Sequence, residues 1–162
     1  MINSKQLTQK ERTIGDAAVD GLFRGIIAGA LMAAYLVAVG LAAGEGPGTV
    51  LARFAPGEGA SPLVGALLHL AVSGVYGMLF GLGWHLITRR WPFGRLRAGS
   101  FGGLPAWVGG LVYVVALLIL TEVVILPGTD SPLREVPFVH FALAHIIYGM
   151  TLGFLISRGR EG

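Results

Sequence analysis

Four long apolar runs alternate with short polar segments along the chain, at about residues 21–43, 62–87, 104–126 and 137–156. Each run reaches the roughly 20 apolar residues that a helix needs to cross the hydrocarbon core of a bilayer. Arg24 is the only charged residue of the first run and Glu122 the only one of the third, while the other two contain no Asp, Glu, Lys or Arg. The pattern predicts an all-α, polytopic membrane protein with four transmembrane helices in a compact bundle.

The composition agrees with lipid as the solvent. Of the 162 residues, 54% are hydrophobic and 13% are charged, whereas soluble domains average about 25% charged residues. We therefore expect a polar N-terminal segment over residues 1–20, a single transmembrane domain over 21–157 and a short tail over 158–162. The chain has no cysteine, which excludes disulfides and thiolate metal sites.

The positions of the basic residues predict the orientation. All but two of the 12 Lys and Arg residues lie near the N-terminus, in the loop between the second and third runs, or near the C-terminus. The exceptions, Arg53 and Arg134, lie in the other two loops. Because loops rich in Lys and Arg stay in the cytoplasm, we expect both termini to be cytoplasmic.

Small residues recur every four positions on the predicted helices. The candidate helix-packing residues are Gly21, Gly25, Gly29, Ser73, Gly77, Gly81, Gly149 and Gly153. Such stripes let helix backbones approach closely in lipid, where van der Waals contact replaces the hydrophobic effect.

A weak internal repeat relates the two halves of the chain. Tyr76-Gly77-Met78 with Gly81 matches Tyr148-Gly149-Met150 with Gly153, and Ala28-Gly29 matches Gly109-Gly110 less closely. We therefore expect two tandem helix hairpins related by an axis along the membrane normal.

Two histidines in the apolar runs are the best chemical clue. His69 follows Pro62 by seven residues, or roughly 10 Å of helix, and His145 lies at similar depth after Pro137. His140 and Glu122 are expected nearer the outer surface. Ionisable residues at this depth are rare in membrane helices and usually have a partner or a function.

Three interpretations of these residues remain open. In the structural one, each histidine bonds a carbonyl, Glu122 or a hydroxyl group on a neighbouring helix. In the second, His69 and His145 ligate a haem b or a chlorin. In the third, a histidine and Glu122 form a proton or quinone site, with His140 nearby.

The loop between the second and third runs is a candidate docking surface for anionic lipid head groups or an acidic partner. Its basic residues are Arg89, Arg90, Arg95 and Arg97. The alternative is that these residues only keep the loop in the cytoplasm and bind no partner. The chain has no aromatic–basic stripe that would bind nucleic acid and no catalytic motif, so we predict neither a nucleic-acid partner, nor a soluble substrate, nor an enzyme.

Gly25 and Ala28-Gly29, then His69 and the glycine-rich segment 73–81, resemble small bacterial four-helix inner-membrane proteins of unassigned function. The resemblance spans most of the chain, although its motifs are generic helix-packing signals. It implies a bacterial inner-membrane location and supplies no activity, cofactor or site residue.

Three functions follow as hypotheses. The first is an accessory subunit that packs against other subunits of a larger membrane complex, most readily an electron-transfer or photosynthetic one. The second is a small haem b electron carrier that uses His69 and His145. The third is a proton-linked transporter of a small solute.

Overall fold

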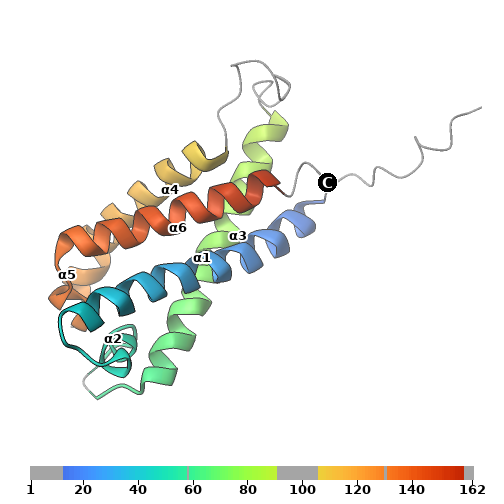
Figure 1. Cartoon of the computed structure of the whole chain (residues 1–162). Helices are drawn as coiled ribbons and strands as arrows, with labels where there is room; N and C mark the ends of the chain where they lie inside the picture. The colour runs from blue at the N-terminus through green and yellow to red at the C-terminus, as the bar shows by residue number, and fades with distance from the viewer. Residues whose placement is uncertain (1–12, 58, 91–105, 130, 159–162) are drawn as a thin grey trace, which may run out of the picture.

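The computed structural model describes residues 13–57, 59–90, 106–129 and 131–158. Its α-helices are α1 (Ile14–Ala42), α2 (Pro47–Ala52), α3 (Pro62–Arg90), α4 (Ala106–Leu120), α5 (Leu126–Gly128) and α6 (Phe138–Arg158). A π-helical turn, Thr121–Ile125, joins α4 to α5, and a 3₁₀ turn, Pro132–Glu135, precedes α6. Four helical stretches are long and apolar enough to cross a membrane, namely α1, α3, α4 through α5, and α6. The predicted all-α membrane bundle is confirmed (Figure 1).

The first helix begins at Ile14, seven residues before the expected start of the apolar run. Thr13 caps it: the Thr13 hydroxyl accepts from the Asp16 N–H at 3.1 Å, and the Asp16 carboxylate accepts from the Thr13 N–H at 2.9 Å. This reciprocal capping box satisfies two backbone donors. Residues 14–20, which were expected in the polar N-terminal segment, therefore form the first turns of α1.

The bundle consists of two antiparallel hairpins. Helix α1 packs along α3 and α4 packs along α6, and the hairpins meet mainly where α1 contacts α6. Arg24 of α1 supports this contact, because its side chain pairs with Asp20 at 2.7 Å and donates to the Leu155 carbonyl of α6. The one charge in the first apolar run thus has partners inside the bundle.

Backbone-to-backbone contacts hold each hairpin together. A Cβ added to Gly21 would lie 2.5 Å from the Gly77 carbonyl oxygen, and a Cβ added to Gly149 would lie 2.6 Å from that of Gly110. Real Cβ atoms essentially never come this close to another heavy atom. The two hairpins therefore close through the same kind of glycine-to-glycine approach.

The register of the internal repeat differs from the one expected from the sequence. In the first hairpin Gly21 lies against Gly77, and in the second hairpin Gly110 lies against Gly149. The structure therefore makes Gly110 the equivalent of Gly21. The sequence comparison paired Gly110 with Gly29, which lies eight residues, or about two turns, further along α1. Because many positions of α1 are small, its glycine pattern alone does not define the alignment.

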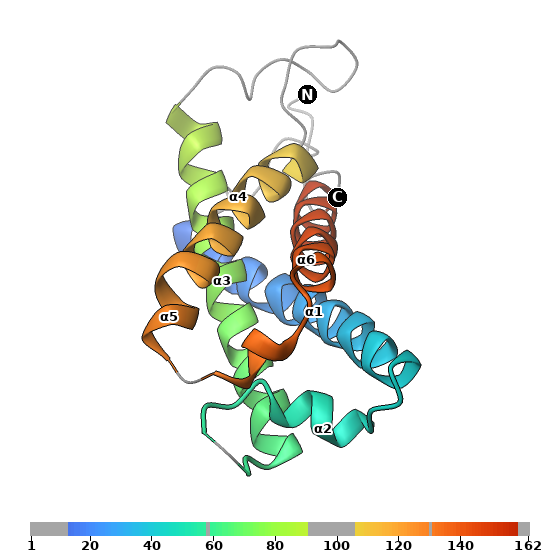
Figure 2. The same ribbon diagram turned by 90° about the vertical axis from the view of Figure 1, so that its left-hand side faces the viewer.

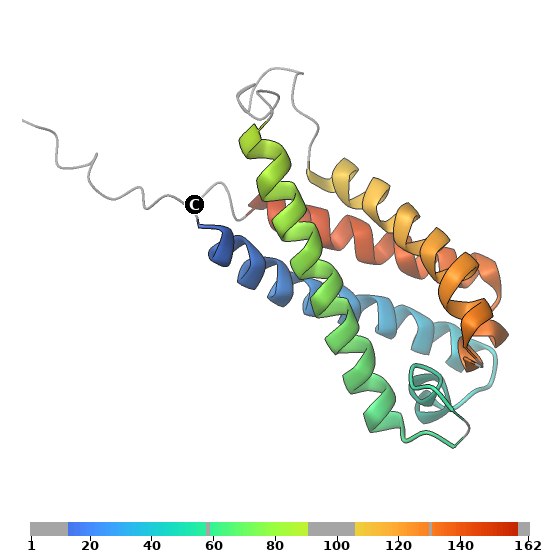
Figure 3. The same ribbon diagram turned by 180° about the vertical axis from the view of Figure 1, so that it is seen from behind.

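Helices α3 and α4 touch little and diverge toward the end of the bundle that carries α2 and α5 (Figure 3). Helix α2 lies across the ends of α1 and α3 there (Figure 2). Gly65 of α3 makes room for it, since a Cβ at this position would overlap the Leu51 carbonyl. The result is a wedge-shaped space between the hairpins, which loop segments close at one end.

The π-helical turn lies on the α4 side of this wedge. The Leu126 N–H bonds to the Thr121 carbonyl, five residues back. Pro127 has no N–H for the Val123 carbonyl, so the regular α-helical ladder is interrupted at this point. Residues 121–125 consequently face different directions from those that a continuous α-helix would give them.

Candidate ligand pocket between the two hairpins

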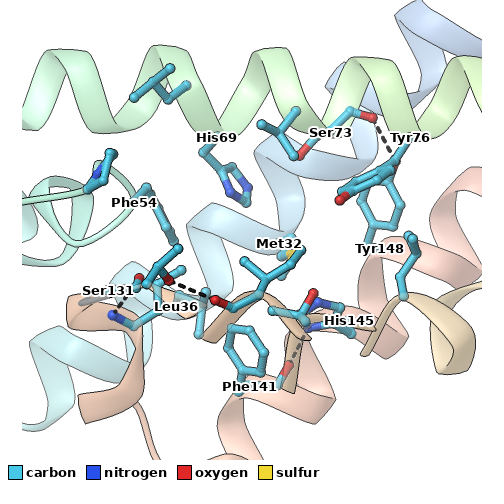
Figure 4. A pocket seen from close by; sticks show the side chains of 18 residues that line it. Met32, Leu36, Phe54, His69, Ser73, Tyr76, Ser131, Phe141, His145 and Tyr148 are labelled. Atoms are coloured by element: carbon cyan, nitrogen blue, oxygen red, sulfur yellow. Dashed lines mark hydrogen bonds between the residues drawn. The ribbon is translucent and has the colours of Figure 1, made fainter. Parts of the chain in front are cut away.

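A cavity of about 280 Å³ lies in the wedge between α3 and α4. Helices α1 and α6 form its floor, and the segments after α2 and α5 close one end (Figure 4). Helices α3 and α6 contribute its principal aromatic and polar side chains: His69, Ser73, Tyr76, Phe141, His145 and Tyr148. Both histidines predicted from the sequence therefore face the same cavity.

These six residues are related by the internal repeat. The alignment that matches Tyr76 with Tyr148 also matches Ser73 with His145 and His69 with Phe141. Each helix thus presents three equivalent positions to the pocket, and each presents one histidine, at a different height. The pocket lies between the repeats, and its polar groups break the symmetry.

His145 is 8% exposed and lines the pocket from α6. Its Nδ1 lies 2.8 Å from the Phe141 carbonyl oxygen. Because a carbonyl only accepts, Nδ1 carries the proton, and Nε2 of the neutral ring is a hydrogen-bond acceptor. No described residue donates to Nε2. The Phe141 ring packs against the imidazole, with ring centroids 4.5 Å apart.

His69 has the opposite tautomer. Its Nε2 donates to the Gly29 carbonyl of α1 at 3.0 Å, which leaves Nδ1 as the acceptor. The Phe54 ring stacks on the imidazole, with ring centroids 4.3 Å apart. His69 thus makes the bond that the structural interpretation describes, namely one to a backbone carbonyl of a neighbouring helix.

Two tyrosines tie the hairpins together beside the pocket. The Tyr148 hydroxyl donates to the Ser73 carbonyl at 2.7 Å, and the Tyr113 hydroxyl donates to the Tyr76 carbonyl at 2.9 Å. Both bonds reach α3 from the second hairpin. They mark the inner end of the wedge, where the hairpins converge.

The pocket opens sideways between α3 and the π-helical turn. Three of its lining residues are also substantially exposed: Leu68 is 40%, Val72 49% and Ile125 37% exposed. In a membrane-spanning bundle such surfaces contact lipid. These three residues connect the lining of the pocket with the exposed surface of the bundle.

The other predicted polar residues lie elsewhere. Glu122 lines a separate hollow with Arg134 and Glu135, and no hydrogen bond or ion pair within the described residues joins it to a histidine. His140 Nδ1 shares a hydrogen bond of 3.0 Å with the Tyr35 hydroxyl. The pairing of Glu122 with a histidine, which was one of the open interpretations, is not formed among the described residues, because the π-helical turn carries Glu122 to the other hollow.

The geometry bears on the haem hypothesis as well. A haem held by both pocket histidines would use Nδ1 of His69 and Nε2 of His145, because Nε2 of His69 bonds Gly29 and Nδ1 of His145 bonds Phe141. His145 alone has the arrangement typical of a ligating histidine, with Nδ1–H on a carbonyl and Nε2 bare. Among the described residues, no group of three or more His, Asp or Glu side chains could hold a metal ion.

The Arg-rich loop is only partly described. Arg89 is exposed near the end of α3, Arg90 ends that helix, and Arg95 and Arg97 lie outside the described residues. Of this candidate docking surface, the structure places Arg89 and Arg90 at the end of the bundle opposite α2.

An ion-pair network fixes the segment that closes the pocket. Arg53, just after α2, bonds Glu45 at 2.9 Å and pairs with Glu135 at 3.3 Å. The network links both loops at this end of the bundle. The hydrogen bond from Arg53 lowers the pKa of the Glu45 carboxyl below its ordinary value. Sequence analysis missed the network, since Glu135 is far from Arg53 and Glu45 in the chain.

Comparisons with protein-family models, curated proteins and solved structures found no match to this chain.

Proposed function

We propose that this protein is an integral-membrane accessory subunit that holds one small lipophilic molecule within a larger electron-transfer or photosynthetic assembly of a bacterial inner membrane. In this proposal both termini and the Arg-rich loop are cytoplasmic, and the pocket lies toward the outer leaflet. The observation that carries the proposal is the cavity between the hairpins, which is lined by the buried His145 and the half-buried His69 and borders exposed side chains of α3 and the π-helical turn.

The lining of the pocket supports binding of a lipophilic ligand. It is mostly apolar and aromatic, with a few polar groups at defined places, as is usual for small-molecule sites. A polar atom without a partner is unfavourable in an apolar interior. The bare Nε2 of His145 would gain a partner if a ligand with a hydrogen-bond donor occupied the pocket.

The position of Glu122 supports a binding role over proton-coupled transport or catalysis. Either of the latter would use a carboxylate close to the histidines to pass or abstract a proton. Glu122 instead lines the second hollow, beside Arg134. We therefore assign the pocket to binding rather than to chemistry.

The test uses a pair of tryptophan substitutions in the π-helical turn. Thr121 lines the pocket, whereas Val123, two residues on, is 67% exposed and lies outside it. The full chain is extracted gently with its partners, analysed by native electrophoresis, and its bound small molecules are identified by mass spectrometry. We expect a higher-mass assembly and a lipophilic molecule that is lost in Thr121→Trp and kept in Val123→Trp.

Two results would contradict the proposal separately. Migration as a free monomer under all gentle conditions would exclude the accessory-subunit role. Equal ligand content in Thr121→Trp and Val123→Trp would exclude the pocket as the binding site.

A further inference from the structure

We infer that the ligand of the pocket is a quinol, the diphenolic, reduced form of a membrane-soluble quinone. The inference rests on the proposed function and names the chemical class of its ligand.

The first step is the hydrogen-bonding character of the two imidazoles. Each has one N–H committed to a backbone carbonyl: His145 Nδ1–H to Phe141, and His69 Nε2–H to Gly29. The remaining nitrogen of each neutral ring can only accept. The pocket therefore has two imidazole acceptors, one from each hairpin, and they are complementary to a ligand with two donors.

The second step is the shape of the lining. An aromatic ring packs against each imidazole, Phe54 against His69 and Phe141 against His145. Flat groups favour offset stacking in such surroundings. A volume of about 280 Å³ lies at the lower end of the range for ligand sites, so it suits a single substituted ring whose tail leaves between Leu68 and Ile125.

The third step separates the two redox forms of the ligand. A quinol carries two hydroxyl donors, whereas the quinone carries two carbonyl acceptors that would face the bare imidazole nitrogens without a proton between them. A buried acceptor left without a donor is unfavourable. The pocket should therefore prefer the quinol, and an acyl chain, which has no donor, should bind without using the histidines.

The experiment compares the two redox forms of one probe. The full chain in phosphatidylcholine nanodiscs is equilibrated without oxygen with a decyl-substituted benzoquinol or with the matching quinone, and the bound probe is quantified against empty nanodiscs. We expect the quinol to bind about tenfold more tightly than the quinone, as expected for a buried hydrogen bond.

Variants of the two histidines test whether these residues cause the preference for the quinol over the quinone. His145→Phe and His69→Phe keep a flat ring and remove the acceptors, so each should weaken quinol binding about tenfold and change quinone binding little. His85→Phe is the matched control, because His85 is on α3 but does not line the pocket; it should behave as the wild type.

Equal binding of the quinol and the quinone by the wild type would overturn the inference. This comparison uses the wild-type protein alone, so it does not depend on whether a variant folds. So would quinol binding that is unchanged in both pocket variants. If the molecule released from the extracted protein is lipophilic but has no hydroxyl donor, the quinol inference fails while the proposed function stands. If Thr121→Trp leaves every bound molecule in place, both fail.

Discussion

The helices pack differently at the two ends of the bundle. At one end glycines bring α1 onto α3 and α4 onto α6 until backbones touch, as at Gly21 and Gly77. At the other end α3 and α4 diverge, and loops, aromatic rings and two histidines surround a cavity. Helices in lipid associate through close packing, so the glycine-packed end supplies the rigidity that lets the pocket end stay open.

The largest expected effect comes from breaking the glycine-packed end. A Cβ on Gly77 would overlap backbone atoms of Gly21 and Gly25, which cannot move without separating α1 from α3. Gly77→Ala should lower the free energy of unfolding by about 3 kcal/mol, at the upper end of overpacking effects. Denaturation by SDS in mixed micelles, followed by circular dichroism, measures it.

Gly83 provides the control on the same helix. A Cβ at this position meets no atom within 4 Å, so Gly83→Ala should leave the stability nearly unchanged. Equal loss of stability in the two variants would show that glycine packing does not hold this end together.

A smaller effect is expected where the two ends meet. Tyr148→Phe removes the hydroxyl that bonds the Ser73 carbonyl. Hydrogen bonds between membrane helices contribute about 0.6 kcal/mol on average and up to about 1.7 kcal/mol, so we expect a loss of about 1 kcal/mol in the same unfolding experiment. Ligand retention should fall as well, because the hairpins separate beside the pocket. Unchanged stability and retention would mean that this bond does not align the hairpins.

The smallest effect concerns the closure of the pocket and its dependence on pH. Since Arg53 lowers the pKa of Glu45, the folded form is stabilised above the ordinary carboxyl value of 4.5, and this contribution is lost as the pH falls through the lowered pKa. Hydrogen exchange of the α2 amides, corrected for intrinsic rates, should be slow at pH 7 and faster once the pH falls through the lowered pKa of Glu45. Glu45→Gln should show the faster exchange already at pH 7; a wild-type pH response in that variant would assign the effect to another group.

Sequence reasoning predicted the glycine-packed end better than the pocket end. Four apolar runs and their small-residue spacing define the spans and the hairpins, because lipid imposes strong constraints on helix length and packing. In the structure α1 extends seven residues before the apolar run, through the polar turns that follow Thr13. The sequence also places His69 and His145 at similar distances from Pro62 and Pro137, and both line the pocket, although at different heights along the repeat.

The pocket itself was not predictable in this way. It depends on the divergence of α3 from α4, on the packing of α2 against Gly65, and on the π-helical turn before Pro127. Each is a tertiary feature or a local backbone change that hydrophobic periodicity does not encode. For the same reason, the sequence pattern did not indicate that Glu122 lines a hollow separate from the one that the two histidines line.

The central claim is that a lipophilic molecule enters the bundle between the hairpins, and photolabelling tests it most directly. On α6, Phe141 and His145 are buried, whereas Leu143 and Ile146 are exposed to lipid. A small lipophilic diazirine in the surrounding bilayer should label the two buried and the two exposed residues. Thr121→Trp should protect Phe141 and His145 from labelling, whereas Val123→Trp should not. Labelling confined to Leu143 and Ile146, or labelling of Phe141 and His145 that persists in Thr121→Trp, would contradict the account.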